Sequence, residues 1–222
     1  MAIKSVLFNT EMVRAILDGR KGCMRRIVKG FVPDDAIWGY TVFTPKGYIS
    51  CRGIFADGYG EKFFKLPYQT GDILYVRETW EHFECHCCEG DVHGNCYKEP
   101  QQNVLNKGCG CYMYRATNEI SGDARWHPSI YMPKEAARIW LKVTDVRVER
   151  LQEITEVGIQ KEVEVDPKEC AGKFDFISEL FLLFQRLWNS TIKKSDLDRY
   201  GWDASPWVWV IEFERCEKPK GV

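Results

Sequence analysis

Short segments of alternating apolar and polar residues recur along this chain of 222 residues, and turn-forming residues separate them. The most regular is Trp-Val-Trp-Val-Ile-Glu-Phe (207–213), which is rich in the aromatic and β-branched residues that strands favour. Turn signals at 44–47 and 56–60 predict two hairpins within 38–68. The same pattern predicts further strands at 3–8, 73–80, 112–116 and 139–148.

Helical signals are fewer and shorter. Asn9 and Thr10 suit the N-cap of a helix that ends before Gly19, and an apolar stripe over 174–188 predicts a packing helix. Short helices are also expected at 133–138 and 153–162. We therefore expect an α+β fold, a β-barrel with short flanking helices, rather than a doubly wound sheet. A single domain over 1–222, with a cysteine-rich insertion at about 81–111, fits this length.

The charge balance limits how such a chain can meet nucleic acid. Lys and Arg total 31 and Asp and Glu total 32, so the formal net charge is -1. Any nucleic-acid contact therefore has to be a local basic patch. The N-terminal segment lacks the apolar stretch of a signal peptide, and no apolar run approaches the ~18 residues that span a bilayer. We expect a cytoplasmic protein that does not enter membranes and whose cysteines stay reduced.

Six segments, spread over nearly the whole chain outside the cysteine-rich insertion, form a joint pattern. They are Ile-Leu-Asp-Gly-Arg-Lys-x-x-x-Arg-Arg (16–26), Gly-Asp-Ile-Leu-Tyr-Val-Arg-Glu-Thr-Trp (71–80), Tyr-Arg-Ala (114–116), Trp-x-Pro-Ser-Ile-x-Met-Pro (126–133), Val-Thr-Asp-Val-Arg-Val-Glu-Arg-Leu-Gln (143–152) and Pro-Trp-Val-Trp-Val-Ile-Glu-Phe (206–213). The pattern resembles the ASCH family of the PUA-like superfamily, and most closely its longer branch in phages and prophages. The resemblance implies a PUA-like barrel whose cleft, beside the Gly-Arg-Lys loop, engages RNA, DNA or modified nucleosides. For a phage-encoded chain, the expected compartment is the host cytoplasm.

Small bacterial members of this family hydrolyse N4-acetylcytidine with a lysine base, a threonine nucleophile and a glutamate acid. The resemblance aligns the lysine with Lys21 and the glutamate with Glu162, with Glu164 as an alternative register. The threonine aligns with Met24, whose thioether has no proton to lose and cannot form an acyl intermediate. The nearest nucleophile is Cys23, although a strand would point it to the face opposite Met24.

Basic and aromatic residues suggest where a nucleic acid would bind. Arginine can hold phosphate through paired hydrogen bonds, and an aromatic ring can stack a base for ~1–3 kcal/mol. The alternative is an ordinary solvated run of charges with the tryptophan in the core. The resemblance favours the binding interpretation. The predicted nucleic-acid-binding residues are Arg20, Lys21, Arg25, Arg26, Arg77, Trp80 and Arg115.

Six of the 10 cysteines fall in the insertion, together with His82, His86 and His93. Thiolates with occasional imidazoles form tetrahedral structural zinc sites. The alternative is a flexible loop with free thiols. The sequence predicts a structural zinc, and no other cofactor, with ligands among Cys85, Cys87, Cys88, Cys96, Cys109 and Cys111.

Three functions remain open from the sequence. The first is a binding module for RNA, DNA or a modified nucleoside, and the second is an amidohydrolase of N4-acetylcytidine-like nucleosides. The third is an interaction protein that uses the aromatic hairpins at 38–68. The missing threonine favours the first of these.

Overall fold

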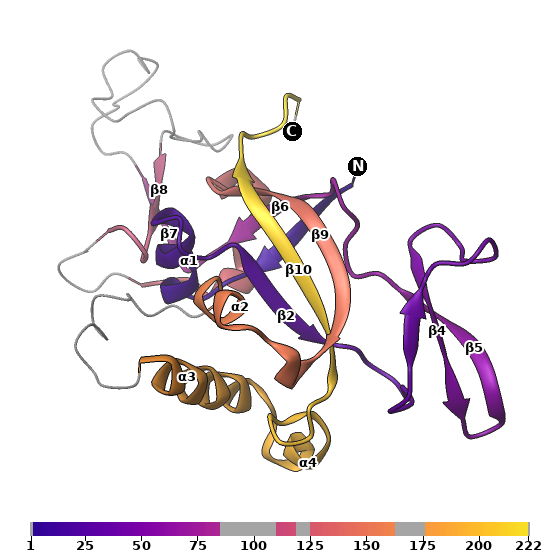
Figure 1. Cartoon of the computed structure of the whole chain (residues 1–222). Coiled ribbons are helices and arrows are strands. Elements are labelled where there is room, and N and C mark those ends of the chain that lie inside the picture. The colour runs from indigo at the N-terminus through magenta and orange to yellow at the C-terminus, as the bar shows by residue number, and fades with distance from the viewer. Residues whose placement is uncertain (1, 85–109, 119–124, 163–175, 222) are drawn as a thin grey trace. The chain divides into compact units, whose positions relative to one another are not determined.

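The computed structural model describes residues 2–84, 110–118, 125–162 and 176–221. Within them the chain forms two compact units, each assembled from segments far apart in the sequence. The first unit contains Arg20–Asp72 and Lys142–Glu214, and the second contains Ala2–Gly19, Ile73–Leu141 and the chain from Arg215 onward. The fold is mixed α+β, built mostly of strands with a few short helices, as the sequence predicts (Figure 1).

The strands of the first unit form two sheets. In one sheet β10 lies between β9 and the edge strand β2, and in the other the order is β3-β4-β5. The elements of this unit are β2 (Cys23–Ile27), β3 (Ile37–Gly39), β4 (Tyr48–Phe55), β5 (Gly58–Lys65), most of β9 (Trp140–Arg150), most of β10 (Trp207–Cys216), the 3-10 turns η4 (Leu151–Glu153) and η6 (Lys194–Asp196), and the helices α2 (Glu156–Gln160), α3 (Phe176–Thr191) and α4 (Leu197–Tyr200). The predicted hairpins, the predicted helices and the strand at 207–213 are thus confirmed.

The register between β10 and β2 decides which residues share a face. Val210 lies opposite Arg25, and Trp209 lies opposite Arg26. Because side chains alternate along a strand, Arg25 and Val210 point to one face while Arg26 and Trp209 point to the other. The two neighbouring arginines are thereby separated: Arg25 is buried, whereas Arg26 is exposed.

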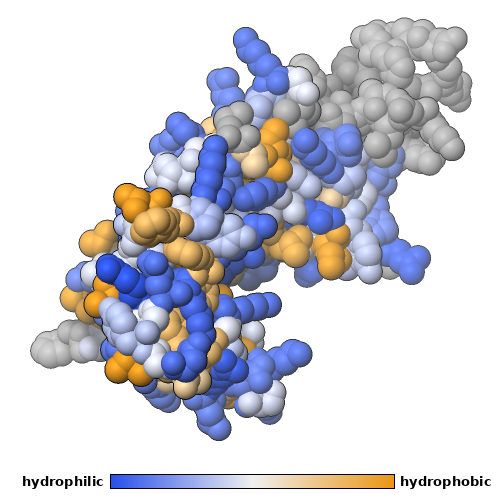
Figure 2. Space-filling model, turned by 90° about the vertical axis from the view of Figure 1, so that its right-hand side faces the viewer, coloured by the Kyte–Doolittle hydropathy of each residue, from blue (hydrophilic) through white to orange (hydrophobic). Residues whose placement is uncertain are grey.

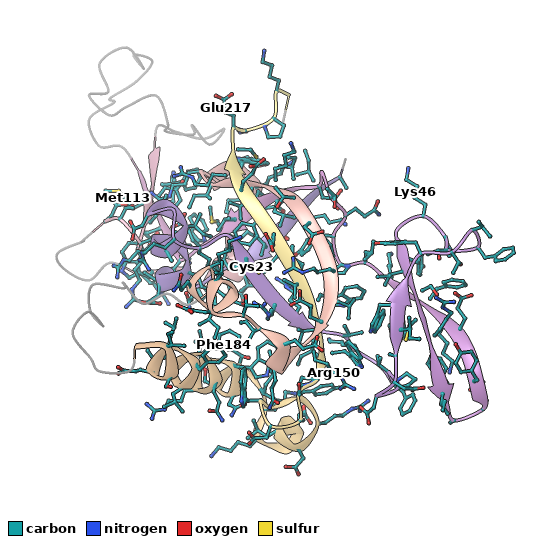
Figure 3. The ribbon with its side chains drawn as sticks, viewed as in Figure 1. Cys23, Lys46, Met113, Arg150, Phe184 and Glu217 are labelled. Atoms are coloured by element: carbon teal, nitrogen blue, oxygen red, sulfur yellow. The ribbon has the colours of Figure 1, made fainter. Side chains whose placement is uncertain are left out.

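The core of the first unit lies on the Val210 face. There the apolar stripe of α3 packs against β2 and β10, and Phe184 points from the helix toward the strands (Figure 3). Trp188 completes this contact, and its indole nitrogen donates to the Tyr200 carbonyl at 2.8 Å. The predicted packing role of 174–188 is therefore confirmed for the described part, 176–188.

The indole ring of Trp38 connects the β3-β4-β5 sheet, here called the hairpin sheet, to β10. Its centroid lies 5.2 Å from that of Phe64 on β5, and 5.8 and 6.2 Å from those of Trp207 and Trp209 on β10. Edge-to-face contacts of this kind add to the free energy gained by burial. The hairpin sheet is therefore held to β10 through a cluster of aromatic rings.

The second unit contains the parallel pair β1–β6, the start of β9, and the hairpin β7–β8. Its core gathers Tyr112, Tyr114, Met132 and Trp140. Its elements are β1 (Ile3–Leu7), α1 (Thr10–Leu17), β6 (Ile73–Arg77), β7 (Trp80–Glu84), β8 (Gly110–Tyr114) and the 3-10 turns η2 (Ser129–Tyr131) and η3 (Lys134–Ala136). The strand at 3–8 and the helix capped by Asn9 are confirmed, since the Asn9 side chain accepts from the Met12 amide at 2.7 Å.

The prediction of one strand over 73–80 is wrong, because the chain breaks after Arg77 and resumes as β7. The break coincides with Glu78, a buried carboxylate that accepts two hydrogen bonds from Arg138, both at 2.9 Å. Burial raises the pKa of Glu78, and the two Arg138 contacts oppose this shift. The hairpin partner of β8 is therefore β7 rather than β6, with Trp80 opposite Tyr114.

In the part of the chain that the structure describes, the strand orders do not close into a barrel, so the predicted β-barrel stays a prediction. No helix among the described residues is long and apolar enough to cross a membrane. The face shown in Figure 2 is mostly hydrophilic, with clusters of apolar side chains between the charged ones. Several apolar residues of the 38–68 region are exposed, and Val42, Phe43 and Tyr59 are the most accessible.

Candidate functional site

Lys21 and Glu162 come together although 141 residues separate them. The Lys21 ammonium donates to the backbone carbonyl of Glu162 at 2.9 Å, and both residues are buried. The same segments also meet through their backbones, since the Gly22 amide donates to the Lys161 carbonyl at 3.1 Å. The segment before β2 and the end of α2 are therefore closely joined.

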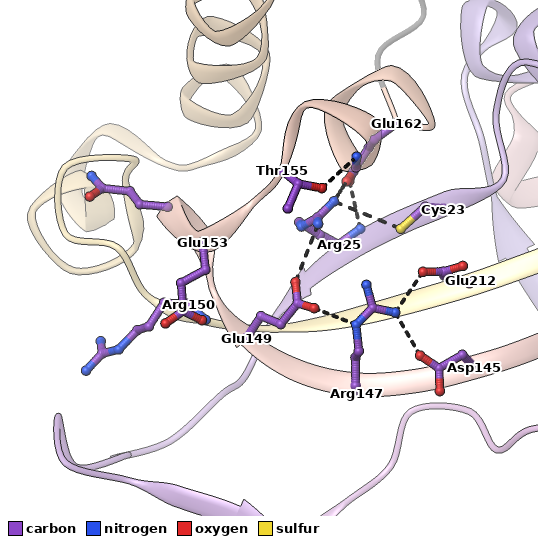
Figure 4. Close-up of polar contacts among 12 residues, drawn as sticks. Cys23, Arg25, Asp145, Arg147, Glu149, Arg150, Glu153, Thr155, Glu162 and Glu212 are labelled. Carbon is purple, nitrogen blue, oxygen red and sulfur yellow. Dashed lines mark hydrogen bonds and ion pairs between the residues drawn. The ribbon is translucent and has the colours of Figure 1, made fainter.

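The Glu162 carboxylate is bound to Arg25 (Figure 4). One oxygen accepts from the Arg25 amide at 2.8 Å, and the other accepts from the Arg25 guanidinium. The side chains are only 2% and 10% exposed, so the pair is shielded from water. Buried charges are stable only when they are paired and hydrogen-bonded. Both oxygens of the Glu162 carboxylate therefore serve to bind Arg25 on the edge strand.

The ion pair continues into a network on the same face of the sheet. Arg25 lies 3.6 Å from Glu149, which also binds Arg147. Arg147 reaches Asp145 and Glu212, both at 2.7 Å (Figure 4). Burial alone would lower the pKa of Arg147, but the hydrogen bonds that it donates to its three carboxylate partners raise it overall. The positive charge of Arg25 is thus compensated within the network.

Neither possible replacement for the family's threonine is positioned as a nucleophile. Met24 is 5% exposed and Cys23 is 2% exposed. Burial, followed by the neighbouring Glu162 carboxylate, raises the pKa of the Cys23 thiol to about 12. Cys23 points into the core beside α2 (Figure 3). The thiol therefore stays protonated at neutral pH, and thiolate chemistry needs the deprotonated form.

A cleft of about 620 Å³ lies along the edge strand β2, and Arg25 is among the residues that line it. Three exposed cations, Arg26, Lys29 and Lys65, stand at it. Its lining contains no acidic side chain among the described residues. The residues that line it are Arg25, Arg26, Ile27, Val28, Lys29, Phe64, Lys65, Pro67, Trp188, Thr191, Ile192 and Trp209.

Arg25 links this cleft to the buried network. Its Nη atoms face Glu162 and Glu149, while its Nε is buried and makes no hydrogen bond to any residue that the structure describes. A buried donor without a partner costs free energy, roughly 1–3 kcal/mol.

The remaining predicted binding residues divide between the two units. Arg20 is half-buried and belongs to the first unit, whereas Arg77, Trp80 and Arg115 belong to the second. Arg77 donates to the Met132 carbonyl at 2.9 Å and to the Ile130 carbonyl. Trp80 packs against Tyr112 and His127, while Arg115 is exposed in a turn. The structure therefore brings together Lys21, Arg25 and Glu162, with Arg26 on the opposite face of the same strand.

The predicted zinc ligands Cys85, Cys87, Cys88, Cys96 and Cys109 lie outside the described residues. Cys111 belongs to β8, where its backbone is opposite Phe83. The described residues contain no group of three or more potential metal ligands. The structural zinc stays a prediction of the sequence.

Sequence reasoning missed several residues that line the cleft. Phe64, Lys65, Trp188 and Trp209 come from β5, α3 and β10, and nothing in their spacing marks them as neighbours of Arg26. One available signal was the Phe-Phe-Lys sequence at the end of the second hairpin, in which aromatic and basic residues are adjacent. Comparison of the chain with protein-family models, with curated proteins and with solved structures finds no match.

The state of Cys23 can be tested by alkylation of the native protein. We expect Cys23 to react with iodoacetamide at pH 8 much more slowly than the half-buried Cys216, because its thiol is buried and its pKa is near 12. Tryptic cleavage after Lys21 and Arg25 isolates Cys23, so mass spectrometry can follow both sites. Equal rates would contradict the buried, protonated thiol.

The buried ion pair can be tested by urea unfolding. Replacing Glu162 by Ala leaves the Arg25 guanidinium buried without its closest partner, so we expect the free energy of unfolding to fall by ~3–5 kcal/mol. E162Q keeps the size and one acceptor and should lose less. Glu156→Ala on the exposed side of α2 is the control and should stay within ~0.5 kcal/mol of wild type. A Glu162→Ala loss as small as the control's would contradict the structural role.

Proposed function

We propose that this chain is an ASCH-type, PUA-like protein that binds nucleic acid or a modified nucleoside in the cleft along β2. The observation that carries the proposal is the lining of this cleft, which combines four basic side chains with aromatic rings and no carboxylate among the described residues. Basic side chains attract phosphate, and aromatic rings stack on bases. The net charge of -1 agrees with a local basic surface rather than a basic protein.

The cations of the cleft have different roles in this proposal. Lys21 and Arg25 are buried in contacts with Glu162, so they support the wall. Arg26 is exposed and its guanidinium lies 5.7 Å from the ring centre of Tyr68. Lys29 and Lys65 are exposed as well. These three supply the positive charge that meets the ligand, while the half-buried Phe64 offers a ring to a base and the buried Trp209 supports the wall behind it.

Single substitutions of the exposed cations test this proposal. We expect Arg26→Ala and Lys65→Ala to weaken binding of a single-stranded oligonucleotide, measured by fluorescence anisotropy. Each should also lower the slope of log affinity against log salt by about one, because each removes a phosphate contact. Lys46→Ala removes an exposed lysine from the loop before β4, outside the cleft, and is the control (Figure 3). Loss of the same size in all three variants would contradict the assignment to this cleft.

The second candidate is the amidohydrolase, favoured by the contact between Lys21 and Glu162. Against it stand the buried Met24, the protonated Cys23 thiol and the commitment of the Glu162 carboxylate to Arg25. The binding proposal predicts no release of acetate from N4-acetylcytidine, even at high protein concentration, when products are followed by chromatography. Turnover that Lys21→Ala abolishes would replace binding by catalysis as the function.

A further inference from the structure

A second, smaller cleft of about 260 Å³ lies on the other side of the Val28–Gly30 turn. Its aromatic lining residues are Phe31, Tyr200 and Trp207, and its basic ones are Arg150 and Arg199. Val28 lines both clefts, so they adjoin along one short stretch of chain. The complete lining of the second cleft consists of Val28, Gly30, Phe31, Val32, Asp34, Arg150, Arg199, Tyr200, Ala204, Pro206 and Trp207.

Aromatic rings continue from the first cleft into the second. Trp209 lines the first and Trp207 lines the second, and because they are two residues apart on β10 they point to the same face. Trp38 packs against both rings and also against Phe64 in the first cleft. The two clefts are therefore joined by a common aromatic wall within the first unit.

The charges of the second cleft leave one arginine best placed for a ligand. Arg150 stacks over Trp207 at 4.3 Å and pairs with Asp34 at 2.7 Å, so its charge is compensated. Arg199 lies over the Tyr200 ring at 5.0 Å, remains exposed, and donates only a long 3.4 Å hydrogen bond to the Gly30 carbonyl. Phe31 is 60% exposed at the same cleft, which makes it the ring most accessible to a base.

We infer that the two clefts are successive subsites for one unpaired strand of nucleic acid, with Arg199 and Phe31 holding the nucleotide next to the one bound at Arg26. This inference rests on the proposed function of the first cleft and defines its ligand as an oligonucleotide rather than a free nucleoside. Rings can stack on bases only where the bases are not already paired and stacked inside a duplex. A phosphate between the two nucleotides would pass the Val28–Gly30 turn, beside Lys29.

The test compares two ligands on the full-length chain: a single-stranded oligothymidylate of eight residues and thymidine 5′-monophosphate, with oligouridylate as the RNA counterpart. We expect Arg199→Ala and Phe31→Ala to weaken oligonucleotide binding about five-fold or more while leaving monophosphate binding unchanged. Arg26→Ala should weaken both ligands. Lys46→Ala and Tyr40→Ala are matched controls, because they remove an exposed lysine and an exposed aromatic ring outside both clefts.

The outcomes separate this inference from the proposed function. If wild type binds the oligonucleotide and Arg26→Ala weakens it, but neither second-cleft variant does, the first cleft is supported and the extended track is wrong. Duplex binding as tight as single-strand binding would also overturn the track. If wild type binds no probe at low salt, the proposed function itself fails. Urea midpoints equal to wild type for Phe31→Ala and Arg199→Ala exclude unfolding as the cause of any loss.

Discussion

The buried ion pair between Arg25 and Glu162 is the interaction on which the first unit depends. It joins the edge strand β2 to the end of α2, and it uses both the backbone amide and the side chain of Arg25. An edge strand has unpaired backbone groups that must be satisfied or covered. Here the Glu162 carboxylate accepts a hydrogen bond from the backbone amide of Arg25 on this strand. In return, the Lys21 ammonium donates to the backbone carbonyl of Glu162. In this structure the contacts among Lys21, Arg25 and Glu162 hold the edge strand β2 against the end of α2.

Because Arg25 is bound to Glu162, the two neighbouring arginines of β2 have different surroundings. Arg25 and Arg26 are neighbours, but the alternation of β2 turns one into the neutralising network and the other toward the cleft. Cys23 follows Arg25 to the buried face, where its thiol is held in the protonated form. Met24 is on the same face as Arg26 but is buried. The chemistry of this segment is thus decided by strand alternation rather than by composition.

Much of the fold could be predicted because its elements have strong local signals. The strand at 207–213 and the helix capped by Asn9 carry periodicity and capping that need no distant partner. The break between β6 and β7 could not be predicted in this way. It coincides with the buried pair of Glu78 with Arg138, 60 residues away, and in the sequence Glu78 looks like an ordinary polar position within a strand. Tertiary pairing of this kind overrides a local pattern.

The candidate site was predictable in the same unequal way. The sequence singled out Lys21 and Glu162 as candidate site residues but did not fix their positions relative to each other, because periodicity carries no information on contacts across 141 residues. Trp209 reaches the cleft through its register opposite Arg26, while Phe64 and Lys65 reach it where the hairpin sheet packs against β10 through Trp38. No short segment of the sequence encodes these long-range contacts. By contrast, the sequence predicted Arg77 to bind nucleic acid, but its guanidinium donates hydrogen bonds to two backbone carbonyls within the second unit.

Basic residues on an edge strand also have a purely structural use, because charge discourages pairing with another chain. That use would explain Arg26 and Lys29, which lie on or just after β2. It does not explain Lys65, which ends a strand of the other sheet and faces the same cleft. Nor does it require aromatic rings beside the charges. Cations from two sheets around a shared aromatic wall are what the proposed nucleotide ligand, which is both anionic and aromatic, would require.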